Sequence, residues 1–257
     1  MHIEFASILA LSVLFLSLAL PSFKARDRRD FSLSILTKHL TAMTIIGGIR
    51  FWNGIAGQQF ETASDIPDSF FKGKKIIHTV VEKIVDGDTV RVRHKSCTRA
   101  RSYEGPMKDH TIMVRIAAVD TPETAKRGEK GQPFAEEARL FTEKQLKNKE
   151  VDVKLLSKDK YGRVIGRISY KSTYFFGMVS IKRDISEELL KQGLAVVYRQ
   201  GGAQYDGGVA QWNALEQRAI QQKKGMWKNG KDKVETPAQY KRKAKEPVMA
   251  GAKANYL

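Results

Sequence analysis

The sequence has a single cysteine, Cys97, among its 257 residues. One thiol cannot form an intramolecular disulfide, and it cannot build the multi-cysteine cluster of a structural zinc site. The histidines do not compensate, because His78, His94 and His110 are not placed at a spacing typical of a ligand pair. Disulfide scaffolds and zinc sites made of sulfur and imidazole ligands are therefore excluded, and we interpret Cys97 as an unpaired loop thiol.

Acidic residues are scarce relative to basic ones. Lys and Arg total 45 against 28 Asp and Glu, which gives a formal net charge of +17. Apolar residues make up 42% of the chain, enough for a packed core, so composition does not predict disorder for the bulk of the protein. An excess of this size favours a polyanionic partner, and nucleic acid is a more common one than a membrane surface.

Charge is absent from Phe5 to Leu20, a run rich in Leu, Ile, Val and Phe. At about 1.5 Å per residue this run is marginal for crossing a hydrocarbon core of about 30 Å. Glu4 precedes it, whereas a basic cluster follows it, which favours a signal-anchor with a cytosolic C-terminal side over a cleaved signal peptide. We predict that residues 1–30 are a signal-anchor or signal peptide. A single-pass membrane anchor follows from this prediction, with secretion as an alternative.

Residues 31–75 are predicted to be a linker that contains a second apolar stretch, Leu40–Gly57. This stretch fits a second membrane segment, an interfacial helix or part of a targeting sequence. The neighbouring arginines and hydroxyl residues resemble a mitochondrial presequence, although Asp27 and Asp30 argue against one. A mitochondrial location therefore stays open as a further alternative.

From Ile76 the pattern changes to that of β-strands. Apolar or alternating runs occupy residues 76–85, 89–93, 112–119, 151–156 and 164–170. Helical spacing of apolar residues marks 133–146, a capping pattern opens 184–193, and a third helix carries Trp212, Leu215 and Ala219 on one face. This order predicts a mainly β fold with α-helices: an OB-fold five-stranded barrel with about three helices.

Three short segments carry the candidate active-site residues: Val85–Val90 (VDGDTV), Val114–Glu123 (VRIAAVDTPE) and Asp159–Arg163 (DKYGR). Each is a weak signal alone, but their order, their spacing and the helices between them together resemble the active site of the staphylococcal nuclease (thermonuclease, TNase-like) family. The segments GQPFAEEA, GLA and GMW at 131–138, 193–195 and 225–227 strengthen the match.

The resemblance covers about residues 76–227, which we predict to be a thermonuclease-like OB-fold domain. It looks closest to a fungal branch of membrane-tethered endonucleases, which also places an Ile-Pro-x-x-Phe-Phe pattern, here Ile66–Phe71, just before the barrel. Residues 228–257 are basic and contain proline, and are expected to form a disordered tail.

The residue types suit phosphodiester hydrolysis without reference to any family. That reaction needs a cation, a positioned water and donors for the developing oxyanions. Asp88 and Asp120 stand at strand ends, where their carboxylates can converge on a hard cation. Arg115 and Arg163 have planar guanidinium groups that match two phosphate oxygens.

The resemblance implies specific roles. Asp88, Asp120 and the carbonyl of Thr121 would bind Ca²⁺ as the cofactor, and Glu123 would orient or deprotonate the attacking water. Arg115 and Arg163 would bind the phosphate and tighten on the transition state. The implied activity is that of a Ca²⁺-dependent endonuclease acting on DNA and/or RNA. Nothing in the sequence identifies a protein partner.

Each of these residues also has a purely structural interpretation. Asp88 could cap a hairpin, and Asp86 could either support the metal or only shape the turn. Arg115 and Arg163 could be surface charges, and Glu123 could be a first-turn helix acid. The catalytic interpretation depends on finding these residues together and in this order.

Residues 94–111 form a longer loop than bacterial nucleases have, and the loop contains Lys95, Arg99, Arg101 and Lys108. It could bind the phosphate backbone, restrict access, or be a plain insertion. Two other functions remain open. One is a non-catalytic OB module that binds nucleic acid or protein, which the retained carboxylates disfavour. The other is a membrane-anchored interaction protein, which only the N-terminal segment supports.

Overall fold

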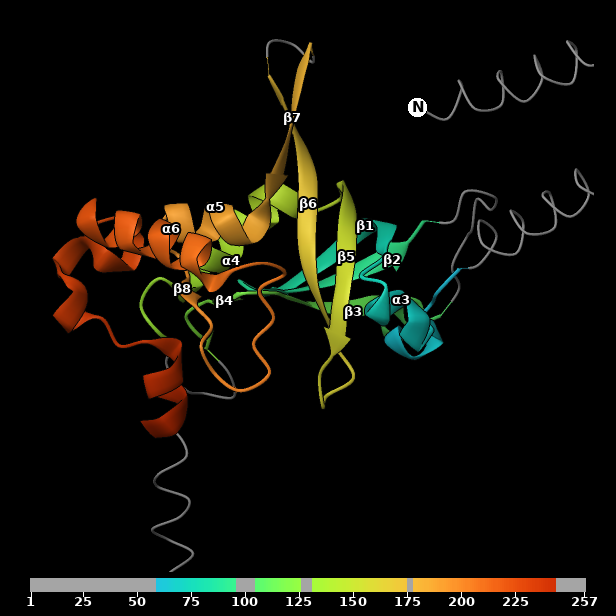
Figure 1. Cartoon of the computed structure of the whole chain (residues 1–257), viewed down its shortest axis with the longest axis horizontal. Helices are drawn as coiled ribbons and strands as arrows, with labels where there is room; N and C mark the ends of the chain where they lie inside the picture. Colours follow the sequence, from blue (N-terminus) through green and yellow to red (C-terminus); the bar gives the residue numbers. More distant parts are fainter. Residues whose placement is uncertain (1–58, 96–104, 126–130, 175–177, 244–257) are drawn as a thin grey trace, which may run out of the picture. The chain divides into compact units, whose positions relative to one another are not determined.

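The computed structural model describes residues 59–95, 105–125, 131–174 and 178–243, shown in colour in Figure 1. The predicted segments Phe5–Leu20 and Leu40–Gly57 lie outside this part of the chain, as does Cys97. Among the helices that are described, none has the length and apolar character needed to cross a bilayer.

Five strands form a closed barrel: β1 (Ile76–Asp86), β2 (Thr89–His94), β3 (Ile112–Ile116), β5 (Glu150–Lys158) and β6 (Val164–Tyr174). Their order is β3-β2-β1-β5-β6, and a parallel pairing between β3 and β6 completes the ring. Closure leaves the barrel without the unpaired edges of an open sheet. The predicted five-stranded OB-fold barrel is confirmed, and its strands match the predicted runs to within a few residues except at 112–119.

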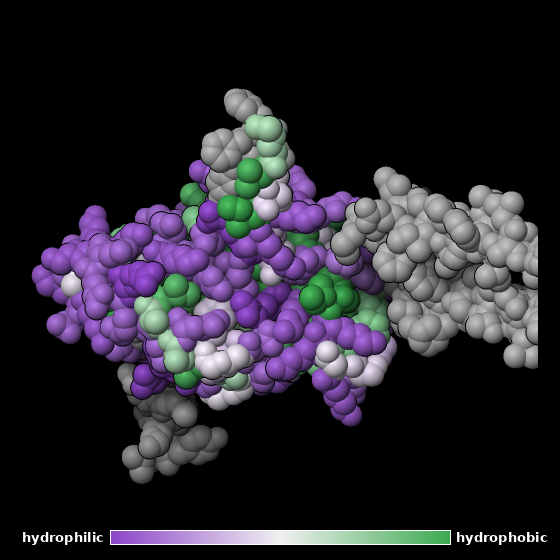
Figure 2. Space-filling model, turned by 45° about the horizontal axis from the view of Figure 1, so that its top comes forward, coloured by the Kyte–Doolittle hydropathy of each residue, from purple (hydrophilic) through white to green (hydrophobic). Residues whose placement is uncertain are grey.

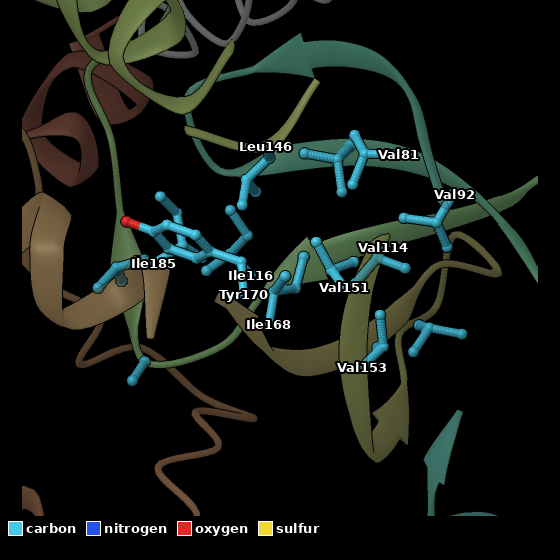
Figure 3. Close-up of a cluster of buried hydrophobic side chains, with 14 of the residues drawn as sticks. Val81, Val92, Val114, Ile116, Leu146, Val151, Val153, Ile168, Tyr170 and Ile185 are labelled. Atoms are coloured by element: carbon cyan, nitrogen blue, oxygen red, sulfur yellow. The ribbon is translucent and has the colours of Figure 1, made fainter. Parts of the chain in front are cut away.

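The barrel is filled by the β-branched and aliphatic residues that alternate along the strands. Figure 3 shows Val81, Val92, Val114 and Val153 pointing into one cluster, and all four side chains are buried. Leu146 and Ile185 reach the same core from helices that cover the barrel. This burial is the main stabilising contribution to the fold.

Three helices pack near one end of the barrel: α4 (Ala135–Leu146), α5 (Ile185–Lys191) and α6 (Val209–Gln221). Helix α5 begins at Asp184, whose carboxylate accepts hydrogen bonds from the amides of Ser186 (2.8 Å) and Glu187 (3.3 Å). The predicted cap is therefore confirmed. Trp212 of α6 is fully buried in the core, as its place on the apolar face indicated.

The apolar run 112–119 is not one strand. Strand β3 ends at Ile116, and a separate strand β4 (Val119–Asp120) pairs with β8 (Val196–Val197) in a second small sheet. Between them Ala118 adopts a left-handed backbone, with φ of 68°. Hydrophobicity alone does not reveal this break, because all the residues of the run except Met113 and Arg115 are buried.

A further strand, β7 (Val179–Asp184), pairs with β6 outside the barrel and lengthens β6 into a projecting hairpin. Most of the surface drawn in Figure 2 is hydrophilic, but apolar residues gather on this hairpin. Met178, Val179 and Ile181 are exposed there. This strand was not predicted, because four of its six residues are polar or charged and most of its side chains are exposed.

Residues 59–75 are part of the domain and not the linker that the sequence suggested. They contain a 3₁₀ turn, η1 (Ala63–Asp65), and a short helix, α3 (Asp68–Lys72). Phe60, Ile66 and Phe71 are buried in the same core as the barrel strands. The domain therefore begins before Ile76, and the Ile-Pro-x-x-Phe-Phe pattern is a packing element.

Replacing Ile66 by alanine should destabilise the domain. Ile66 is only 1% exposed, so truncation removes buried methyl groups and leaves a cavity, at a cost of about 2–5 kcal/mol. Ile76→Ala is the matched control, because Ile76 is 50% exposed and should change stability by no more than about 0.5 kcal/mol. Urea unfolding measures both. Equal stabilities of the two variants would restore the linker interpretation.

The chain beyond α6 is also structured as far as residue 243, where a disordered tail was expected. It forms η3 (Gly225–Asn229), η4 (Lys231–Lys233) and a final helix at 237–243. Met226 and Trp227 are buried in a small second cluster against which Val234 packs. We call residues 230–243 the C-terminal strap.

Candidate active site

The turn between β1 and β2 places Asp88 at the mouth of the barrel. Thr142 of α4 donates a hydrogen bond to the Gly87 carbonyl (2.8 Å), which fixes the turn to the helix. A Cβ at position 87 would lie 2.7 Å from Thr121 Oγ1, so only glycine permits this contact. The turn and the loop that carries Thr121 are therefore packed directly on each other, while the Asp86 carboxylate accepts from the Gly87 amide (2.9 Å).

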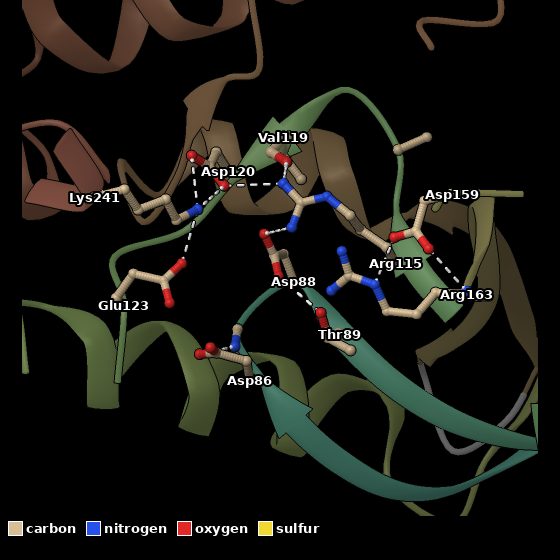
Figure 4. Close-up of polar contacts among 12 residues, drawn as sticks. Asp86, Asp88, Thr89, Arg115, Val119, Asp120, Glu123, Asp159, Arg163 and Lys241 are labelled. Atoms are coloured by element: carbon tan, nitrogen blue, oxygen red, sulfur yellow. Dashed lines mark hydrogen bonds and ion pairs between the residues drawn. The ribbon is translucent and has the colours of Figure 1, made fainter. Parts of the chain in front are cut away.

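Arg115 on β3 joins the two buried aspartates. Its Nη1 donates to Asp88 Oδ2 (2.8 Å) and its Nη2 to Asp120 Oδ1 (2.9 Å), as the dashed lines in Figure 4 show. The guanidinium also lies 5.0 Å from the centre of the Tyr198 ring. Burial by itself lowers the pKa of Arg115, but Asp88 and Asp120 outweigh it and hold this pKa above its ordinary value.

Asp120 reaches the site because the chain breaks at Ala118 and β4 turns away from the barrel. Pairing of Asp120 with Val196 of β8 fixes its backbone, and the residue is only 2% exposed. Burial and the neighbouring Asp88 raise the pKa of Asp120, against the opposing effect of Lys241 and Arg115. The ionised form of Asp120 is therefore less favoured in the folded protein than in water, and pKa shifts of this kind are common at functional sites.

Glu123 lies beside Asp120, three residues further along the same loop. The loop is held by Gln132 through two hydrogen bonds to the Glu123 backbone. The side-chain Oε1 of Gln132 accepts from the Glu123 N–H (2.9 Å), and the backbone N–H of Gln132 donates to the Glu123 carbonyl (2.9 Å). The Glu123 side chain forms an ion pair with Lys241 Nζ at 2.8 Å. Lys241 also contacts both oxygens of Asp120, at 3.1 and 3.4 Å.

Arg163 approaches the site from the loop between β5 and β6. It precedes Val164, which pairs with Val114, so it lies next to the β3 strand that carries Arg115. Its Nε donates to Asp159 Oδ2 (2.7 Å), and the Asp159 Oδ1 accepts from two backbone amides of the loop. Partial burial raises the pKa of Asp159, but the hydrogen bonds from Arg163 and the backbone outweigh it and hold this pKa low.

The structure thus brings Asp88, Arg115, Asp120 and Glu123 together and places Thr121 and Arg163 at the edge of the group. Three carboxylates face two cations, Arg115 and Lys241. Among the described residues there is no group of three or more His, Cys, Asp or Glu side chains arranged around one metal position. The predicted ligand set is compatible with this, since it consists of two carboxylates and a backbone carbonyl.

Two lysines of the basic loop lie in its described part. Lys95 forms an ion pair with Glu150, and Lys108 lies on an exposed 3₁₀ turn, η2 (Met107–Asp109). Arg99 and Arg101 lie outside the described residues. Tyr161 is exposed and lies over Arg163, with 5.5 Å between the guanidinium and the ring centre.

Two site residues were missed in the sequence. Gln132 belongs to a motif that supported the resemblance, but its two-sided bond to the Glu123 backbone could not be predicted. Lys241 was assigned to a disordered tail. The signal for it was present in Thr236-Pro237-Ala238-Gln239, a hydroxyl N-cap, a proline at the first helical position and a glutamine at the third.

Comparison with known proteins agrees with the geometry. The model of the family described as "Staphylococcal nuclease homologue" matches residues 113–229. "Endonuclease Htp3" of Saprolegnia parasitica is 40% identical over 186 residues, which cover 72% of this chain and 84% of that protein.

Two fungal proteins show a similar relationship. "Probable endonuclease LCL3" of Komagataella phaffii is 32% identical over 197 residues, covering 72% of this chain and 82% of that protein. The protein with the same description from Schizophyllum commune is 32% identical over 188 residues, covering 69% and 64% of the two chains. The family predicted from the three motifs is therefore confirmed.

Proposed function

This chain belongs to the staphylococcal nuclease homologue family and is a nuclease, and we propose that it is a Ca²⁺-dependent endonuclease whose active site is the group around Arg115. The observation that carries the proposal is the bridge from Arg115 to Asp88 and Asp120, with Glu123 beside it. A purely structural ion pair would not require three carboxylates to share two cations at the mouth of a barrel.

The residues fit a hard divalent cation. Asp88 and Asp120 offer buried carboxylate oxygens, and the Lys241 ammonium already stands as a positive charge on Asp120 and Glu123. Carboxylate and carbonyl oxygens are the ligands that Ca²⁺ prefers, which supports Asp88, Asp120 and the Thr121 carbonyl as the protein ligands. When bound, Ca²⁺ would offset negative charge that develops on the phosphate.

The remaining residues have complementary roles in the proposal. The Glu123 carboxylate orients the attacking water and accepts its proton. Arg115 donates to phosphate oxygens from the side of the aspartates. The ion pair of Arg163 with Asp159 uses Nε, and we assign its two Nη groups as donors to the phosphate from the start of β6, the strand next to β3. Both arginines would bind the pentacoordinate phosphorus more tightly than the ground state.

Cutting within a strand is tested with a closed circular substrate. Full-length protein with Ca²⁺ should convert circular single-stranded DNA or RNA into linear product, because a free end is not needed for the proposed attack. Linear strands of the same sequence serve as the control. Degradation of the linear strands alone would contradict endonuclease action, and tight binding without any cleavage would favour the non-catalytic OB module.

A nucleic-acid substrate follows from the family, and the choice between DNA and RNA is left to this experiment. The membrane anchor within residues 1–30 stays a prediction from the sequence, because it lies outside the described part of the chain. A reporter fused to residues 1–60 that remained freely soluble in the cytosol would contradict it.

A further inference from the structure

The C-terminal strap delivers a lysine to the centre of the active site. In Figure 4 the Lys241 side chain extends between Asp120 and Glu123. Its Nζ lies 2.8 Å from Glu123 Oε1 and 3.1 Å from Asp120 Oδ1. The lysine is more than 110 residues distant in sequence from both, so the strap must be placed with some accuracy for these contacts to form.

The strap is held in part by side-chain hydrogen bonds, in contrast to the backbone pairing of the barrel strands. Gln132 Nε2 donates to the Glu235 carbonyl at 3.2 Å. Thr236 then caps the final helix: its Oγ1 accepts from the Gln239 amide (3.3 Å), and Gln239 Oε1 accepts from the Thr236 amide (2.8 Å). Gln132 therefore ties together the Glu123 loop and the strap that carries Lys241.

Asp120 already contacts two cationic side chains, which leaves little room on its carboxylate for a metal ion. Asp120 Oδ1 accepts from both Arg115 and Lys241, and Oδ2 is also contacted by Lys241, at 3.4 Å. A carboxylate oxygen that receives an ammonium hydrogen bond cannot offer the same lone pair to a metal. An ammonium at this distance would also repel a divalent cation on the same carboxylate.

We propose that Lys241 is a tethered competitor for the divalent cation: it occupies Asp120 and Glu123 while the strap is closed and withdraws when the cation binds. This inference rests on the proposed Ca²⁺ site and adds a control on it. The strap keeps the carboxylates paired at low Ca²⁺, and the competition raises the Ca²⁺ concentration at which the site fills.

The strap has the properties of an element that can open. The described part of its helix covers residues 237–243, and most of these side chains are exposed or half-buried. Pro237 is buried and Val234 packs on the cluster of Met226 and Trp227, so these two residues anchor the strap. Tyr240, Arg242 and Lys243 are not buried, so opening of the part that follows Pro237 would expose little apolar surface. Opening would therefore cost much less than unfolding the barrel, as is usual for elements that move.

The test measures Ca²⁺ binding to the full-length protein by calorimetry, without substrate. Lys241→Met should bind Ca²⁺ about tenfold more tightly than wild type, a change typical of coupling between two binding events. Lys241→Arg keeps a cation in place and should stay close to wild type. Lys243→Met is the matched control, since it removes the same charge from the same helix and Lys243 pairs with Glu235.

Hydrogen exchange provides the second measurement. The Tyr240 and Gln239 amides are bonded to Thr236 in the closed strap, and saturating Ca²⁺ should lower their protection in wild type. Unchanged protection overturns the proposal, as does an equal change in Ca²⁺ affinity for Lys241→Met and Lys243→Met. If neither wild type nor Lys241→Met binds Ca²⁺, the proposed metal site itself fails, which is a separate result from binding that ignores Lys241.

Discussion

Arg163→Ala is expected to lower the cleavage rate by about 10²–10³ while nucleic-acid affinity changes much less. The reason is that a donor directed at charge that develops only at the phosphorus contributes to the transition state and little to the ground state. The Asp159 ion pair fixes the side chain beforehand, so little ordering is needed during the reaction. Single-turnover cleavage and equilibrium binding at one fixed salt concentration separate the two effects.

Lys160→Ala and Lys108→Ala are the controls for this experiment. Lys160 is in the same loop as Arg163 but lies over the exposed Tyr161 ring, and Lys108 is exposed on η2. Their removal should weaken binding slightly, reduce its salt dependence and leave turnover nearly unchanged. A variant Arg163→Ala that cleaves at the wild-type rate would make Arg163 a surface charge. The non-catalytic module would then become the better account.

Asp120→Asn is expected to have a still larger effect, a loss of about 10²–10⁴ in cleavage rate. A cation held by carboxylates contributes several kcal/mol to a phosphoryl transition state, and each 1.4 kcal/mol corresponds to a factor of ten. Asp88→Asn should behave alike, because Arg115 binds both residues. Asp109→Asn, on the exposed turn η2, is the isosteric control and should retain full activity.

Stability should not follow activity in Asp120→Asn. Because the pKa of Asp120 is raised in the folded protein, its contribution favours the fold at low pH and is lost as the pH rises through the folded pKa. The amide does not titrate, so Asp120→Asn lacks this loss. The difference in melting temperature between Asp120→Asn and wild type, measured without Ca²⁺, should therefore shift in favour of the variant as the pH rises from acid to neutral. A difference that stays constant with pH would contradict the raised pKa of Asp120.

The barrel strands could be predicted because apolar and polar residues alternate in the sequence wherever one face of a strand is buried. Val90 and Val92 of β2 alternate with Arg91 and Arg93, and the strand appears where expected. The break at Ala117–Ala118 could not be predicted in this way. It depends on a backbone turn whose residues are buried and small, so the apolar run continues across it.

The domain boundaries were harder to predict for a related reason. Residues 59–75 and 228–243 are short segments whose apolar anchors are few and irregularly spaced, such as Phe60 and Ile66 in the first and Val234 in the second. They acquire structure only by packing on a barrel formed by the rest of the chain, so local pattern carries little of the information. The site was predictable to the extent that its residues lie in three motifs. Lys241 lies far outside them, and only the fold brings it to Asp120.

The central claim is that this group of carboxylates and arginines hydrolyses phosphodiesters with the help of Ca²⁺. It is tested most directly by the cleavage rate of one full-length preparation with Ca²⁺, then with a chelator, then with Ca²⁺ restored in excess. We expect cleavage, its loss in chelator and its full return, with Mg²⁺ a poor substitute because its octahedral shell adapts less readily. Cleavage that continues unchanged in chelator would contradict the account.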